Sequence, residues 1–254
     1  MNVTSTIFQN NFGKYLELCE RENIIVTKNG KKRAVLLHYP RCELGYEAGE
    51  PISGYGTSPI SEGWVTYREF LEITGKTEKQ YELIDGVIYL LGSPGFTHQS
   101  ILGRLYILFN EFFIDNGDCG PFLSPFDVEL MRNSTMRKRQ LAEDNINVVQ
   151  PDLLVLCDYQ KSIDEDDRYK GIPSLVVEIL SPSTRTRDKV KKMDLYMDSG
   201  IQEFWLIDPE KVSIGVYTFE EYELASDDIF FSGQRAVSRL FPGLEAAVDS
   251  VFNI

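Results

Sequence analysis

Glu178 is the residue of this 254-residue sequence whose setting most strongly indicates chemistry. It lies within the run SLVVEIL (174–180), whose unbroken apolar character predicts a strand buried on both faces. By the two-residue period of a strand, Glu178 shares a face with Val176 and Leu180, so it is not the polar half of an alternating strand. Because a buried unpaired carboxylate is costly, Glu178 either pairs with a buried cation in a structural role or binds metal or protons.

Asp152 is the second candidate, at the head of the strand-like run DLLVLC and directly after Pro151. Alone, a Pro-Asp pair is a common turn. With Glu178 on a neighbouring strand, however, two carboxylates can converge at one end of a sheet. Oxygen ligands with several retained waters suit Mg²⁺ (or Mn²⁺), so the sequence predicts a metal site at Asp152 and Glu178.

The segment after this glutamate strand supplies cations and reads as a helix over 183–200. Asp188, Lys192 and Tyr196 recur at i, i+4 and i+8, and Arg185 and Arg187 lie at the helix start. One interpretation is an ordinary surface ion pair between Asp188 and Lys192. The other is that Lys192 reaches back toward the carboxylates, where it orients water or stabilises phosphate charge.

The remaining patterns predict an α/β fold with a mixed sheet. Asp85-Gly86 is a hairpin signal, and Ile101, Leu105, Leu108 and Phe112 form one helical stripe. The expected helices cover 65–74, 98–113 and 183–200, and the expected strands cover 126–131, 152–158, 174–180, 203–208 and 212–219.

Residues 1–41 read as a separate small unit. Phe8, Phe12, Tyr15 or Leu16, and Cys19 recur at helical spacing, and a hairpin is expected around Asn29-Gly30. Such a unit is too small to fold alone, so we expect a homodimer or support from the rest of the chain. The Gly-, Pro- and Ser-rich residues 42–61 are expected to be a linker, and residues 62–254 the main domain.

Charge is distributed unevenly along the chain. The net charge is −13, but residues 1–41 hold seven basic and three acidic residues, a net charge of +4, which leaves −17 for the remainder. A basic segment permits DNA contact, and a second positive surface is expected from basic residues of the main domain. The candidate DNA-binding residues are Lys14, Lys28, Lys31, Lys32, Arg33, Arg185 and Arg187, with Arg132, Arg137, Lys138 and Arg139 as further contributors.

Four cysteines occur without a C-x-x-C pair, so we expect free thiols and neither a zinc site nor a disulfide framework. The sequence also lacks an apolar run of roughly 18 residues and a secretory leader pattern. A cytoplasmic protein without a membrane span is expected.

The motif series YELIDG, HQ, VVQPDLLVLCD and GIPSLVVEILSPSTRTRDKVKKMDLYMDSGIQEFWLIDP strongly resembles the Uma2 family over about residues 62–254. That family is similar to PD-(D/E)xK nucleases, which implies a restriction-endonuclease-like mixed sheet flanked by helices. The resemblance assigns metal binding to Asp152 and Glu178. The superfamily's lysine falls at Leu180 here, but Uma2 members carry a lysine on the next helix, which matches Lys192.

The same resemblance adds Glu82 as a catalytic residue and His98, Gln99 and Asp127 as supporting residues. From the residues alone, Glu82 can equally pair on a hairpin surface, His98 can face solvent or pack in the core, and Asp127 can lie at the surface. FGKYLELCERENIIVTKNGKKRAVLL (12–37) resembles the helix and hairpin of Phd/YefM antitoxins, which dimerise and bind operator DNA.

These patterns favour a metal-dependent endonuclease that hydrolyses DNA. The alternative is a non-catalytic DNA-binding or regulatory protein with a relic nuclease fold. A sugar or nucleotide hydrolase that uses paired carboxylates as acid and base ranks last, because no specific sugar pocket is indicated.

Overall fold

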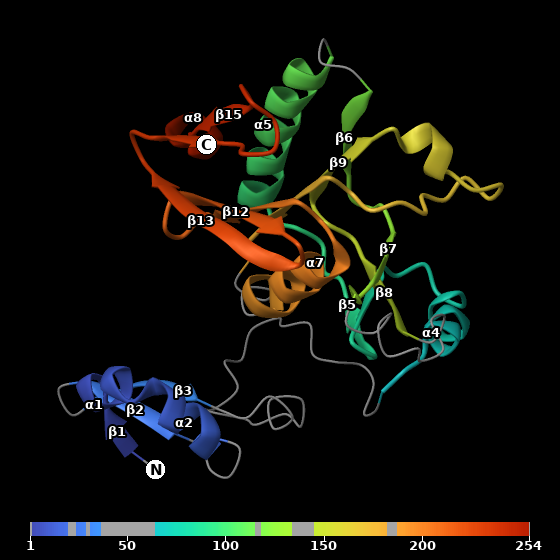
Figure 1. The fold of residues 1–254 in the computed structure, drawn as a ribbon. Coiled ribbons are helices and arrows are strands. Elements are labelled where there is room, and N and C mark those ends of the chain that lie inside the picture. Colours follow the sequence, from blue (N-terminus) through green and yellow to red (C-terminus); the bar gives the residue numbers. More distant parts are fainter. Residues whose placement is uncertain are drawn as a thin grey trace. The chain divides into compact units, whose positions relative to one another are not determined.

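The protein is described by a computed structural model over residues 2–19, 24–28, 31–36, 64–114, 118–133, 145–181 and 187–253. The chain divides into two compact units, Met1–Ser53 and Gly54–Ile254 (Figure 1). The expected linker 42–61 lies outside the described residues. Within the described ranges, no helix combines the length and apolar character needed to cross a membrane.

The N-terminal unit contains the expected hairpin and one strand that the sequence did not indicate. Its strands pair in the order β1-β2-β3, with β1 parallel to β2 and β2 antiparallel to β3. The expected single helix is wrong, because it is divided into two. The elements are β1 (Asn2–Thr4), α1 (Ser5–Asn10), α2 (Phe12–Cys19), β2 (Ile24–Lys28) and β3 (Lys31–Leu36).

The interruption between α1 and α2 changes which aromatic residues are buried. Phe8, Tyr15 and Cys19 pack in the core of this unit, whereas Phe12 and Leu16 are exposed. The helical spacing therefore located the core residues only in part. The Asn29-Gly30 turn lies outside the described residues.

The larger unit is built on a six-stranded mixed sheet, which confirms the predicted fold class. The strand order is β13-β12-β11-β10-β9-β6, and the single parallel pair among these strands is β10 with β11. The bounds are β6 (Cys119–Leu123), β9 (Leu153–Cys157), β10 (Leu175–Ile179), β11 (Glu203–Asp208), β12 (Ser213–Glu220) and β13 (Glu223–Phe231). β6 and β13 were not expected.

A second, antiparallel sheet has the order β5-β4-β8-β7. It comprises β4 (Tyr81–Ile84), β5 (Val87–Leu90), β7 (Val128–Met131) and β8 (Ile146–Val149). The expectation that strand 126–131 joins the main sheet is wrong, because its backbone pairs with β8 instead. The predicted hairpin turn is confirmed, since Asp85 and Gly86 have positive φ angles of 49° and 75°.

Helices cover both faces of the large sheet. On one face, α5 and α8 pack with Leu175, Val177 and Ile179; on the other, α7 and the small sheet pack with Val176 and Leu180. Figure 1 shows the long α5 running beside β6. The remaining elements are α4 (Tyr67–Thr74), α5 (Phe96–Phe113), η2 (Tyr159–Ser162), η3 (Arg187–Lys192), α7 (Met193–Ser199), β14 (Arg235–Val237), β15 (Glu245–Ala247) and α8 (Val248–Phe252).

The expectation of free thiols is wrong for two cysteines. Cys119 and Cys157 form a disulfide, and they lie directly opposite each other on β6 and β9. Cysteine spacing along the chain cannot reveal this pair, because the sheet register brings together residues that are 38 positions apart. Cys19 is a buried free thiol, and Cys42 lies outside the described residues.

Candidate active site

Glu178 lies in the middle of β10, where all five residues are buried. Its side chain shares the face of Val176 and Leu180, as the strand period predicted. Its Oε1 accepts hydrogen bonds from Lys192 Nζ (2.7 Å) and Tyr196 OH (2.5 Å). Burial raises the pKa of Glu178 well above its usual range, and Lys192 opposes this rise.

Lys192 is 2% exposed. It does not form a surface ion pair, and its side chain points toward the carboxylates. Its Nζ lies 2.7 Å from Glu178 Oε1, 2.7 Å from Glu82 Oε1 and 3.8 Å from Asp188 Oδ1. Parallel pairing of β10 and β11 requires a crossover connection, and this crossover carries Lys192 back across the face of Glu178.

The crossover is not the regular α-helix that the sequence predicted. Its first described part, η3, is a π-helix that ends at Lys192, and α7 continues from Met193 to the positive-φ Gly200. A π-helix turn takes up about one residue more than an α-helix turn and is frequent at functional sites. Asp188 and Tyr196 are both buried. The carboxylate of Asp188 adds to the rise in the pKa of Glu178, and burial together with the charge of Glu178 raises the pKa of Tyr196. The predicted stripe of Asp188, Lys192 and Tyr196 is therefore present, but part of it is on a π-helix. The expected helix start at 183–184 lies outside the described residues.

Asp152 is the residue directly before β9, and it lies beside the C-terminal end of the neighbouring strand β10. Its Oδ2 accepts a hydrogen bond from the backbone N–H of Ile179 (2.7 Å) and lies 3.1 Å from His98 Nε2. His98 is in the first turn of α5 and is largely buried. Asp152 adds to the negative potential that raises the pKa of Glu178.

Glu82 is fully buried on β4, so the alternative of a pair on a hairpin surface is wrong. Besides Lys192, its Oε1 accepts a hydrogen bond from the backbone N–H of Gln150 (3.0 Å). Two supporting residues do not join the cluster. Gln99 is exposed, and Asp127 is exposed and accepts a hydrogen bond from Gln150 Nε2 (2.7 Å).

The electrostatic balance separates this cluster from an ordinary buried carboxylate. Three carboxylates, from Glu82, Glu178 and Asp188, lie around one ammonium group. Glu203 is equally buried, but its oxygens accept from Trp205 Nε1 and from backbone N–H groups at 239 and 240. Glu203 therefore has a complete structural explanation, whereas Glu178 shares the Lys192 ammonium with the carboxylates of Glu82 and Asp188.

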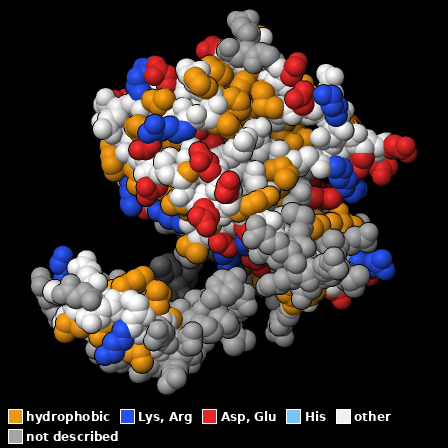
Figure 2. Space-filling view, viewed as in Figure 1, with side chains coloured by type: hydrophobic (Ala, Val, Ile, Leu, Met, Phe, Trp, Pro, Cys, Tyr) orange, Lys and Arg blue, Asp and Glu red, His pale blue; other side chains and the backbone are white. Residues whose placement is uncertain are grey.

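The expected DNA-binding surface stays a prediction, because most of its basic side chains are not described. The described side chains of Lys14 and Lys28 are exposed. The side chains of Lys31, Lys32, Arg33 and Arg187, and the residues Arg185, Arg137, Lys138 and Arg139, lie outside the described part of the chain. On the face drawn in Figure 2, acidic and basic side chains of the larger unit are interspersed.

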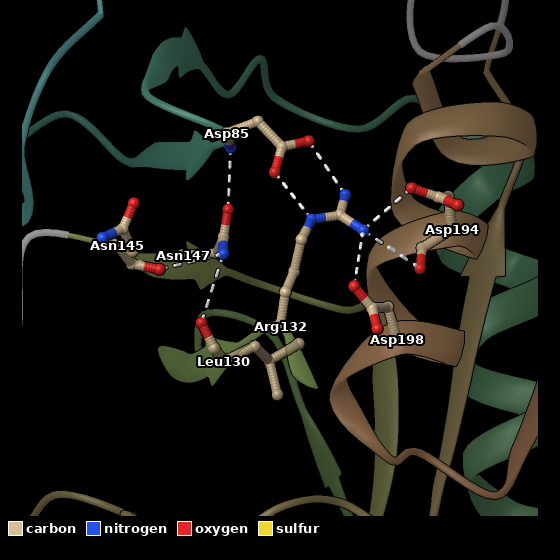
Figure 3. A network of polar contacts seen from close by, with 7 residues as sticks. All are labelled: Asp85, Leu130, Arg132, Asn145, Asn147, Asp194 and Asp198. Atoms are coloured by element: carbon tan, nitrogen blue, oxygen red, sulfur yellow. Dashed lines mark hydrogen bonds and ion pairs between the residues drawn. The ribbon is translucent and has the colours of Figure 1, made fainter. Parts of the chain in front are cut away.

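The expectation that Arg132 contributes to a positive surface is wrong. Its side chain is only 12% exposed and forms ion pairs with Asp85, Asp194 and Asp198 (Figure 3). Sequence reasoning also missed Gln150 and the buried Asn147, which accepts from the Asp85 N–H (2.7 Å). An amide within the apolar strand run INVV was a usable signal for Asn147, whereas nothing local indicated the buried position of Arg132.

Comparison with known proteins supports the fold and identifies the family. A structure titled a "putative nuclease belonging to DUF820", from Anabaena variabilis, is similar with a TM-score of 0.56 and 22% identity, covering 74% of this chain and 98% of that chain. At this identity, the likeness shows a shared fold. An uncharacterized Synechocystis protein is 28% identical over 188 residues, covering 72% of this chain and 89% of the relative.

The family model described as "Putative restriction endonuclease" matches residues 67–249. The match begins at Tyr67, so the resemblance of the N-terminal unit to Phd/YefM antitoxins stays a prediction. The family match includes Glu82, Asp152, Glu178 and Lys192, and it spans more than half of the sequence. The chain therefore belongs to the Uma2 family of restriction-endonuclease-like proteins.

Proposed function

We propose that this protein is a metal-dependent endonuclease that hydrolyses DNA phosphodiester bonds. The observation that carries the proposal is the buried Glu82–Lys192–Glu178 contact, with Asp152 bonded to the backbone of the residue after Glu178. Leu180, at the usual lysine position, is buried in the core. The ammonium of Lys192 supplies the missing basic group from the crossover.

The donor set fits a hydrated Mg²⁺ or Mn²⁺ ion. Asp152 and Glu178 would hold it, because both supply carboxylate oxygens and Asp152 lies near enough to Glu178 to raise its pKa. Among the described residues, no three His, Cys, Asp or Glu side chains form a group that could hold a metal ion. Two carboxylates with several waters and a substrate phosphate are the usual environment of Mg²⁺. When bound, the ion would supply an activated water and neutralise charge on the scissile phosphate.

The neighbouring residues have separate roles in this proposal. Lys192 fixes the Glu178 carboxylate and places positive charge beside the phosphate. His98 and the Ile179 N–H orient Asp152 through its Oδ2. Tyr196 holds the Glu178 carboxylate through the hydrogen bond that its OH donates to Oε1, and both side chains are buried.

DNA is the proposed partner, and a homodimer is the proposed assembly. The exposed Lys14 and Lys28 would contact phosphates, which are the sequence-independent part of a DNA interface. The exposed Phe12 and Leu16, in a unit too small to fold alone, support self-association.

The test is cleavage of supercoiled plasmid, single-stranded DNA and RNA by the full chain with Mg²⁺ or Mn²⁺, with EDTA as the blank. Asp152→Asn and Glu178→Gln are expected to lose roughly 100-fold or more of the activity, because metal assistance is worth several kcal/mol. Asp127→Asn removes an exposed carboxylate outside the cluster and serves as the matched control. Wild-type cleavage no faster than that of the two site variants, with folding intact, would reject the proposal in favour of a non-catalytic DNA-binding protein.

A further inference from the structure

Arg132 connects the two parts of the fold that carry Glu82 and Lys192. It lies one residue after β7 and sends its guanidinium between the β4–β5 turn and α7 (Figure 3). Its Nε and Nη2 donate to the two carboxylate oxygens of Asp85 at 2.7 and 2.9 Å, a two-pronged contact. Its Nη1 donates to Asp194 Oδ2 at 2.8 Å and lies 3.7 Å from Asp198 Oδ2.

Both contacted segments are next to site residues in the chain. Asp85 is three residues after Glu82, and Asp194 is two residues after Lys192. Glu82 belongs to the β4–β5 hairpin, and Lys192 directly precedes α7. The separation between the hairpin and α7 therefore determines how far Lys192 must reach to contact Glu82. The Arg132 fork joins these same two segments.

The turn is held rigidly enough to transmit this constraint. Asn147 Oδ1 accepts from the Asp85 backbone N–H, while Asn147 Nδ2 donates to the carbonyl of Leu130 at 3.3 Å. Gly86 cannot shift freely either, because the ring of Trp64 lies over it and its carbonyl accepts from the Val65 N–H at 2.8 Å. The side chain of Asp85 is thus a fixed anchor.

The other anchor needs Arg132 for an electrostatic reason. Asp194 and Asp198 are one α-helical turn apart, and like charges at this spacing repel each other. A single guanidinium between them offsets this repulsion and draws α7 toward the small sheet. A lysine cannot replace it, because an ammonium lacks the planar fork that bonds two directions at once.

We infer that Arg132 is a positioning residue that sets the approach of Lys192 to Glu82 and Glu178; its catalytic consequence rests on the proposed nuclease function. Without the fork, α7 moves relative to the β4–β5 hairpin, and the Lys192 ammonium loses its place between the two glutamates. A misplacement on the order of 1 Å costs roughly 100-fold in rate. The loss is expected in kcat, with KM little changed, because the guanidinium of Arg132 is already engaged by three carboxylates.

The test follows the Lys192 side chain directly, so it does not depend on cleavage. The full chain is labelled with ¹³C-lysine, and the Lys192 methylene signal next to Nζ is assigned by its absence in Lys192→Met. Arg132→Met is expected to shift this signal toward the position of exposed lysines. Arg235→Met is the matched control, because it removes an exposed arginine–carboxylate pair with Glu245, and it should leave the signal unchanged.

Two further variants keep the test decisive if Arg132→Met fails to fold. Asp85→Asn weakens one arm of the fork, and Asp194→Asn weakens the other; each is expected to shift the Lys192 signal in the same direction by a smaller amount. Arg132→Lys should not restore the wild-type position. A Lys192 signal that stays at its wild-type position in the folded variants overturns the inference, whether or not the protein cleaves DNA.

Discussion

Replacing Lys192 by methionine removes the only ammonium group that contacts the buried Glu178 among the described residues, at nearly unchanged side-chain length. In the wild type, this group lies 2.7 Å from Glu178 and from Glu82. Breaking a buried ion pair from one side typically costs about 3–5 kcal/mol, because a buried charge is left uncompensated. We expect Lys192→Met to lower the free energy of unfolding by this order at pH 7.

The pH dependence follows from the raised pKa of Glu178. Folding raises this pKa above the ordinary value of 4.5, so the folded state takes up a proton that the unfolded state has lost. Stability is therefore highest below that ordinary value and falls as pH rises toward the folded pKa, by up to about 1.4 kcal/mol per pH unit. Lys192 opposes the rise in the wild type, so its loss raises the folded pKa of Glu178 further and extends the fall in stability to higher pH. For one carboxylate, the stability lost between its ordinary pKa and pH 7 is at most about 3 kcal/mol. The corresponding loss at pH 5 is below about 1 kcal/mol.

Tryptophan fluorescence during urea unfolding in EDTA measures the effect in the larger unit alone. Both tryptophans of the chain, Trp64 and Trp205, belong to that unit. Lys161→Met is the control, because it removes an exposed lysine paired with Asp158 at 3.7 Å, and such pairs contribute about 0–1 kcal/mol. A loss below about 1 kcal/mol at pH 7, or a loss equal at pH 5 and pH 7, would refute the reasoning.

Three further predictions concern elements that support the site. Reducing Cys119–Cys157 is expected to lower unfolding stability by roughly 2–4 kcal/mol, because the bridge joins residues 38 apart; finding both thiols free in the native protein by alkylation and mass spectrometry contradicts this. Gly86→Ala should cost about 1–3 kcal/mol, since φ is 75° and an added Cβ would lie 2.1 Å from the Trp64 ring; an unchanged thermal midpoint would exclude this close approach. Asn147→Leu should cost roughly 1–3 kcal/mol by leaving buried polar groups unpaired, and hydrogen exchange should become faster at the β4–β5 turn, which a purely local effect at β8 would leave unchanged.

Local signals in the sequence predicted the elements whose stability is largely local. The Asp85-Gly86 turn, the helix α5 and the buried strand β10 each carry a pattern within a few residues, and each occurs in the structure. Of the predicted α5 stripe, Ile101 and Leu105 are fully buried, whereas Leu108 and Phe112 are only partly buried. β6 and β13 escaped prediction because Pro121 interrupts the first, and the second is largely exposed and rich in charge. The assignment of β7 to the wrong sheet has another cause, since strand pairing depends on partners distant in sequence.

The site was predictable to the extent that its residues break a local rule. Glu178 interrupts an apolar strand, and this anomaly identified it from the sequence alone. Glu82 carries no such anomaly and was assigned only through the family resemblance. The buried position of Arg132 and the contact of Gln150 with Glu82 could not be predicted, because the partners come from distant segments and neither residue type is unusual at its position.

The π-helix before α7 determines how the chain length of the crossover relates to the site. In a regular α-helix, eight residues turn about 80° beyond two full turns, which would separate Asp188 from Tyr196. The additional residue in the wide turn compensates for most of this angle. Removing the exposed Val190 would place the same three side chains at i, i+3 and i+7, a shared face of an ordinary α-helix. A relative whose alignment shows a one-residue gap here can therefore retain the whole site.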